Sequence, residues 1–151
     1  MTTELTRASQ SIYEQDYNLW LEKTIQQLQV RRFTELDLSN LIEELEGMSR
    51  REKRAIYSNL KIILMHLLKY RYQPTKRSNS WRSTIREYRQ RLKRAFQDSP
   101  SLQGYCREIF PECYQDAREL AADETGLVPE AFPTESLFSL EETLAMEYLP
   151  D

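Results

Sequence analysis

The chain has 151 residues, of which 30% are charged and only three are glycine. This length suits one domain with a substantial core, and the scarcity of glycine and the absence of β-branched runs argue against a sheet. With three glycines, the phosphate-binding loop, the dinucleotide-binding loop and the nucleophile elbow of common enzyme classes are excluded. The polar first residues contain no apolar leader segment, and we therefore expect a cytoplasmic protein.

The net charge of −3 conceals a strong segregation of charge along the chain. Residues 1–48 carry four basic and nine acidic side chains, a balance of −5. Residues 49–94 carry fifteen basic and two acidic side chains, or +13, and residues 95–151 carry two and thirteen, or −11. The basic centre of the chain is therefore the first candidate for a binding surface.

We expect residues 1–12 to form a flexible N-terminus and residues 13–151 to form a single all-helical domain. The first helix is predicted over residues 13–30. Asp37 is a favourable N-cap for a second helix over residues 38–48. The inward faces of these two helices are predicted to carry Tyr13, Tyr17, Trp20, Leu21, Thr24 and Leu28, and Leu38, Leu41, Ile42 and Leu45, respectively.

A central helix is predicted over residues 49–72. Gly47 marks a break before it, and Ser49 with Glu52 forms a capping box that would start it. The helix has a broad apolar face that contains Ile56, Leu60, Ile63, Leu64 and Leu67. Its apolar core of seven positions is interrupted by His66 and is far shorter than the roughly 20 residues of a membrane span.

Three further helices follow. The fourth is predicted over residues 81–97 with Ser80 as its cap, and the fifth from Pro100 to a glycine cap at Gly126, with a kink or split at Pro111. A capping box of Ser139 and Glu142 opens a last helix that extends to about residue 148. The sequence thus predicts an all-α, single-domain bundle of about five to six helices around the long central helix, with Trp20 and Trp81 buried against it.

Few residues could carry chemistry. His66 is the only histidine, and a hydrogen-bonded residue at the edge of the core is the simplest interpretation of it. Glu43, Glu44 and His66 form a candidate polar cluster, although a solvated or salt-bridged face explains the glutamates equally well. Cys106 and Cys113 are about 10 Å apart on a regular helix, too far for a disulfide, and are interpreted as core residues. We assign no catalytic or metal-binding residue and expect no cofactor.

The basic segment contains the candidate binding surface. Arg82, Arg86, Arg89 and Lys93 recur at helical spacing on the fourth predicted helix, and the loop before it adds Lys76 and Arg77. Such a stripe can track the phosphates of a nucleic acid. The alternative is that the glutamates of the second helix and of the acidic C-terminal third neutralise it.

Several blocks of the sequence, in order along nearly the whole chain, resemble one known family. They are residues 13–20, 38–45, 66–74, 77–85, 99–102, 124–127 and 132–133. The family is domain of unknown function 29, which is common in cyanobacteria and other bacteria. The resemblance implies a compact all-helical domain in the cytoplasm, and it implies no activity and no catalytic residues.

Two functions remain open at this point. The first is a non-enzymatic helical module that binds another macromolecule, with an unidentified protein as its partner. The second is a nucleic-acid-binding or regulatory protein that uses the basic stripe of residues 69–94. A metal-dependent enzyme built on Glu43, Glu44 and His66 is a third hypothesis. We expect no association with a membrane, and both a monomer and a homodimer remain open.

Overall fold

The computed structural model describes residues 12–151, and these residues form helices and turns without any strand. This confirms the all-α fold class and the long central helix. The chain divides between Arg51 and Glu52 into two compact units. The single domain over residues 13–151 stays a prediction, and the predicted flexible terminus lies outside the described residues except for Ile12.

The N-terminal unit contains a helical turn at residues 12–15, helix α2 (Tyr17–Gln29), the short 3-10 helix η1 (Phe33–Glu35) and the start of α3 (Leu38–Tyr72). Asp16 caps α2 by accepting a hydrogen bond from the Leu19 amide at 3.0 Å. Asp37 precedes α3, and its Oδ1 accepts from the Asn40 amide at 3.4 Å, as the sequence predicts for this cap.

Helix α3 is continuous for 35 residues, so the predicted break at Gly47 and the predicted helix start at Ser49 are wrong. A glycine inside a helix costs only about 1 kcal/mol relative to alanine. The residues on both sides of Gly47 stabilise the helix by more than this cost. No proline interrupts them, so the helix continues through Gly47.

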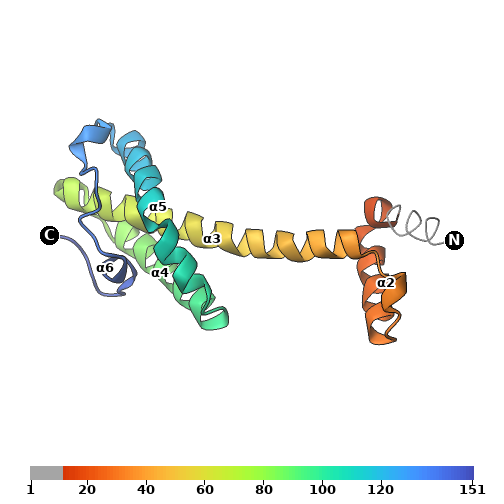
Figure 1. Cartoon of the computed structure of the whole chain (residues 1–151). Helices are drawn as coiled ribbons and strands as arrows, with labels where there is room; N and C mark the ends of the chain where they lie inside the picture. The colour runs from red at the N-terminus through yellow and green to blue at the C-terminus, as the bar shows by residue number, and fades with distance from the viewer. Residues whose placement is uncertain (1–11) are drawn as a thin grey trace. The chain divides into compact units, whose positions relative to one another are not determined.

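The C-terminal unit packs around the second half of α3. It contains η2 (Pro74–Lys76), α4 (Asn79–Asp98), α5 (Leu102–Thr125), η3 (Pro129–Ala131) and α6 (Leu140–Leu144). Figure 1 shows α4, α5 and the C-terminal segment gathered beside this part of α3. The five residues predicted for the apolar face of α3 are fully buried: Ile56, Leu60, Ile63, Leu64 and Leu67. The buried face is broader than this, because Met65 and Leu68 are buried as well.

The helix ends agree with the sequence where a side chain or a glycine sets them. Gly126 ends α5 in the left-handed conformation, with φ of 76°, and Ser139 with Glu142 forms the predicted capping box of α6. Other ends differ. Ser78, not Ser80, caps α4, and its Oγ accepts from the Trp81 amide at 3.2 Å. Helix α6 stops at Leu144.

The two prolines near α5 leave the helix continuous. Pro100 lies in the turn before α5 rather than at its first position. Pro111 lies inside α5 without splitting it. Proline removes one backbone hydrogen bond from a helix, and the buried side chains of α5 on both sides of Pro111, among them Cys106 and Cys113, hold the helix against the core.

The two tryptophans differ in burial. Trp20 is 2% exposed, and its ring lies 4.9 Å from that of Tyr13, centroid to centroid. Trp81 is only half-buried, which corrects the prediction for it. Cys106 and Cys113 are free and fully buried, and burial raises the pKa of their thiols to about 11 and about 12, so both are unreactive core residues. No helix within residues 12–151 is both long and apolar enough to cross a membrane.

Candidate interaction surfaces

The N-terminal unit leaves most of its apolar side chains uncovered. Thirteen large hydrophobic residues are exposed in the described chain, and ten of them lie between Tyr17 and Met48. In the same range Trp20 is the only fully buried hydrophobic residue. Single exposed hydrophobic residues are normal on a protein surface, but a concentration of them marks a site of interaction. The ten residues are Tyr17, Leu19, Ile25, Leu28, Val30, Phe33, Leu38, Ile42, Leu45 and Met48.

Four of these residues form a continuous line on α3, which we call the exposed stripe: Leu38, Ile42, Leu45 and Met48. Each of them is between 52 and 57% exposed. At 100° per residue the four side chains span an arc of about 120° on one side of the helix. Leu41 lies within this arc, between Leu45 and Met48, and is half-buried. The stripe therefore has the width of the face by which an amphipathic helix normally packs on a core.

The exposed stripe corrects the sequence prediction. Leu38, Ile42 and Leu45 are predicted to point inward, and on α2 so are Tyr17 and Leu28, but all five are exposed. Helical periodicity identifies side chains that share a face, and it carries no information on whether the same chain supplies a surface to cover that face. The helical spacing of these residues is therefore the signal in the sequence for this site, and the same spacing also fits a buried face.

Charged side chains lie beside the exposed stripe and on the opposite face of α3. Glu44 accepts hydrogen bonds from the hydroxyl groups of Tyr13 at 2.5 Å and Tyr17 at 2.6 Å. These two bonds, and more weakly the charge of Arg51, hold the pKa of the Glu44 carboxyl below its usual value, so Glu44 is charged at neutral pH. One turn further on, Arg50 pairs with Glu43 at 3.3 Å and with Glu46 at 3.8 Å. The acidic turn is thus followed directly by a basic turn.

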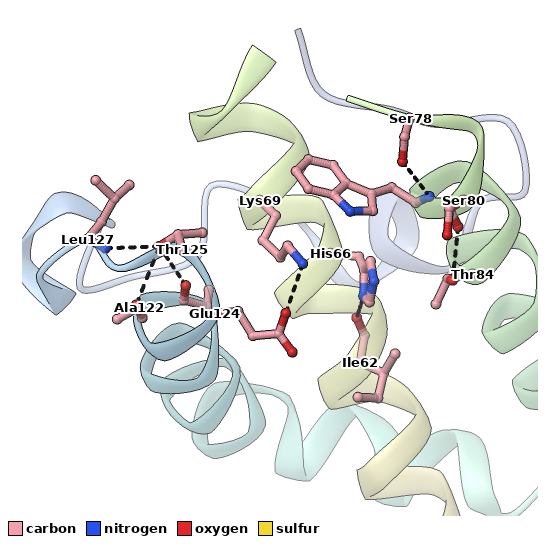
Figure 2. A network of polar contacts seen from close by, with 12 residues as sticks. Ile62, His66, Lys69, Ser78, Ser80, Thr84, Ala122, Glu124, Thr125 and Leu127 are labelled. Atoms are coloured by element: carbon pink, nitrogen blue, oxygen red, sulfur yellow. Dashed lines mark hydrogen bonds and ion pairs between the residues drawn. The ribbon is translucent and has the colours of Figure 1, made fainter. Parts of the chain in front are cut away.

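The predicted polar cluster consists of residues from different units. Glu43 and Glu44 belong to the N-terminal unit and His66 to the C-terminal unit. The Nδ1 atom of His66 lies 3.0 Å from the Ile62 carbonyl oxygen, and burial lowers the pKa of the ring (Figure 2). Across residues 12–151 no group of three or more histidine, cysteine, aspartate or glutamate side chains is arranged to hold a metal ion.

Lys69 lies on the same side of α3 as His66 and is almost fully buried. Its Nζ atom donates to Glu124 of α5 at 3.0 Å and lies 4.7 Å from the centre of the Trp81 ring (Figure 2). A buried ammonium group needs such partners, because leaving it unpaired costs several kcal/mol. Lys69 of α3 therefore contacts both α4 and α5. Its ammonium group is already paired within the protein, so it is not available to bind a ligand.

The predicted basic surface is only partly exposed. Lys76, Arg82, Arg86 and Lys93 are exposed, whereas Arg77 is half-buried and donates to the carbonyl oxygens of Tyr70 and Asp151 at 2.7 Å. Among the six predicted residues, which also include Arg89, Arg86 alone lies within 4 Å of a side-chain carboxylate in the described chain, at 3.8 Å from Glu147. The acidic side chains of the C-terminal third therefore pair with only one of the predicted cations in the described chain.

Arg89 is not on that surface. It is 2% exposed, and its guanidinium group donates to four backbone carbonyls of the C-terminal segment. The distances to these oxygens are 3.3 Å for Glu142, 2.8 Å for Thr143, 3.4 Å for Met146 and 2.8 Å for Tyr148. Burial lowers the pKa of Arg89 to about 10, which leaves it charged at neutral pH. Arg89 fastens the chain end to α4.

A groove of about 350 Å³ lies between α4, α5 and α6. Phe96, Cys106 and Leu144 line it, and the polar side chains at its edge include Arg107 and Glu141. These two already form an ion pair at 2.6 Å. A small-molecule site needs polar groups that are free to orient the ligand, and here the charged pair is satisfied within the protein.

Comparison with models of known protein families matches residues 12–149 to the domain of unknown function DUF29. The match spans nearly the whole chain. The chain belongs to the DUF29 family. This confirms the family to which the sequence blocks point, and membership in DUF29 assigns no reaction. No curated protein and no solved structure matches this DUF29 chain.

Proposed function

We propose that this protein is a helical binding module that engages another protein through the exposed stripe of α3. The observation that carries the proposal is the line of four half-exposed apolar side chains, in a segment from Tyr17 to Met48 whose only fully buried hydrophobic residue is Trp20. A helical unit of this size that leaves its apolar face in water loses most of the hydrophobic stabilisation available to it. A partner that covers the stripe would restore that stabilisation.

The polar surroundings of the stripe support binding to a protein rather than insertion into lipid. Glu44 and Glu46 border it on its two sides, and anionic side chains oppose contact with anionic lipid surfaces. We also propose the cytoplasm as the compartment, since two free, buried cysteines suit a reducing environment.

Photo-crosslinking in the native host tests this function. A photoreactive amino acid at position 45 lies on the stripe, and the same amino acid at Ser39 lies on an exposed position of the same helix outside it. We expect position 45 to yield one or a few adducts of discrete mass, and position 39 to yield none. If both positions give no adduct, or the same diffuse products, the stripe is not a binding surface.

Nucleic-acid binding is a second candidate function. Lys76, Arg82 and Lys93 support it, because all three are exposed and none lies within 4 Å of a carboxylate of the described chain. Against it, Arg89 is buried, Trp81 and Tyr88 are half-buried, and few bases could stack on them.

Fluorescence anisotropy with a generic DNA or RNA oligonucleotide decides this question. We expect weak binding or none, because both ends of the chain are acidic and repel phosphate. A surface that contacts four phosphates would instead bind with a slope of log K against log salt of about −3.6, and each lost cation would reduce the slope by about one. Micromolar binding with such a slope, abolished by Arg82→Glu with Lys93→Glu but not by Arg54→Glu, which reverses an exposed charge of α3 outside this surface, would favour the nucleic-acid function over the one proposed above.

A further inference from the structure

A second groove of the C-terminal unit, of about 310 Å³, shares Phe96, Gln103 and Leu144 with the groove described above. We call it the α4 groove, because most of its lining residues lie on that helix. Phe96, Leu144 and Met146 are half-buried and form its apolar wall. A concave surface of this size, with an apolar wall and a few polar groups, has the form of a small-molecule site.

Arg89 lines the α4 groove, although its side chain is only 2% exposed. A guanidinium group carries five N–H donors. In Arg89 the Nε atom donates once, Nη1 donates twice and Nη2 donates once, all to backbone carbonyls. The fifth N–H, on Nη2, has no acceptor within residues 12–151. A buried donor without an acceptor is unfavourable, and an oxygen atom of a ligand in the groove would satisfy it.

Lys93 adds a second cation to the α4 groove, one helical turn after Arg89 and on the same face of α4. It is exposed, and neither cation has a carboxylate within 4 Å in the part of the chain that the structure describes. The carboxylates of the C-terminal segment have other partners. Glu141 and Glu147 pair with other arginines, and Glu142 accepts from a backbone amide in the capping box of α6. The two positive charges of the groove are therefore not compensated within the described chain.

The first turn of α5 adds to this positive character. Gln103 lies in that turn and lines the groove. Ser101, at the N-cap position, makes no side-chain hydrogen bond to the helix, and no acidic residue lies in the first turn. The positive end of the helix dipole is thus not neutralised by the helix itself. Together with the two cations, it makes the α4 groove suitable for an anion.

We propose that the α4 groove binds a small organic carboxylate with an apolar body. One carboxylate oxygen accepts from the free N–H of Arg89, the other pairs with Lys93, and the carbon chain packs on Phe96, Leu144 and Met146. A carboxylate has two oxygens and one charge, which matches the two donor groups that are free. The volume is about ten times that of a water molecule, so the groove has room for about ten non-hydrogen atoms. The site lies in the C-terminal unit and is independent of the proposed binding through the exposed stripe.

A titration of the full chain with octanoate, which has this size, tests the inference by two-dimensional NMR. We expect saturable shifts of the side-chain amides of Gln97 and Gln103, which line the groove, with a dissociation constant of about 0.1–1 mM. Octanamide has the same shape without the charge and should bind at least about tenfold more weakly. Acetate lacks the apolar body and should also bind at least about tenfold more weakly.

Three outcomes of the titration would overturn the inference. The first is the absence of saturation up to about 10 mM octanoate, far above the expected dissociation constant. The second is equal affinity for octanoate and octanamide, which would mean that the cations do not recognise the ligand. The third is a set of shifts confined to the exposed stripe, which would mean that octanoate binds only as an apolar molecule on another surface.

Two variants test whether the charge of Lys93 acts within the groove. Lys93→Gln should weaken octanoate binding by at least about tenfold, because it removes one of the two charges that contact the carboxylate. Arg94→Gln makes the same change of charge at the next residue, which is exposed and does not line the groove, and should bind as the wild type. Equal effects of the two variants would reduce the binding to general attraction by a basic helix and would overturn the site. Thermal melting of both variants checks that the fold is unchanged.

Discussion

Replacing Arg89 with methionine is expected to lower the free energy of unfolding by about 3–5 kcal/mol and the melting temperature by roughly 10 °C. The guanidinium group is the hydrogen-bond donor for four carbonyl oxygens of residues 142–148, and methionine fills a similar volume without any donor. Each buried carbonyl left without a partner costs about 1–3 kcal/mol. The C-terminal segment is expected to detach, so hydrogen exchange over residues 139–151 should accelerate more than exchange in α3.

Arg86→Met is the matched control for this variant. Arg86 lies on the same helix, three residues earlier, and is exposed, with a single contact of 3.8 Å to Glu147, which is more exposed still. Exposed ion pairs contribute about 0–1 kcal/mol, so the melting temperature of this variant should change by only a few degrees. If both variants melt at the wild-type temperature, Arg89 does not fasten the chain end.

The sequence predicted those features of the fold that local chemistry determines. Asp37, Gly126 and the pair Ser139–Glu142 mark helix ends at the positions where the structure has them, because a cap acts within one turn of its own residue. Gly47 was misleading for the same reason. A glycine is only a weak helix breaker, and the residues around it decide whether the helix continues.

The candidate site was harder to predict because it depends on contacts between distant segments. The helical spacing of Arg82, Arg86, Arg89 and Lys93 predicted one cationic stripe, but Arg89 is withdrawn from it by carbonyls that lie 53 to 59 residues further along the chain. In the same way, the spacing of Leu38, Ile42 and Leu45 identified one face of a helix. Only the three-dimensional structure shows that this face is exposed to solvent.

The oxidation rate of Met48 tests the central claim, that the exposed stripe is uncovered within the chain and covered by a partner. Met48 is 54% exposed on the stripe, whereas Met65 is 3% exposed in the core of the C-terminal unit and serves as an internal reference. Dilute peroxide oxidises a methionine thioether at a rate that follows its access to solvent. The measurement is the oxidation rate of both residues, by mass spectrometry, in two samples. One sample is the purified Leu45→Glu variant, and the other is the wild-type protein in an extract of its native host.

In the purified variant, Met48 should be oxidised as fast as a methionine in an unstructured peptide, and Met65 much more slowly. In the extract, a partner that occupies about 90% of the chains would slow the oxidation of wild-type Met48 about tenfold and leave Met65 unchanged. Slow oxidation of Met48 in the purified variant would mean that the chain covers its own stripe. Fast oxidation in both samples would mean that nothing binds there, and either result would contradict the proposed function.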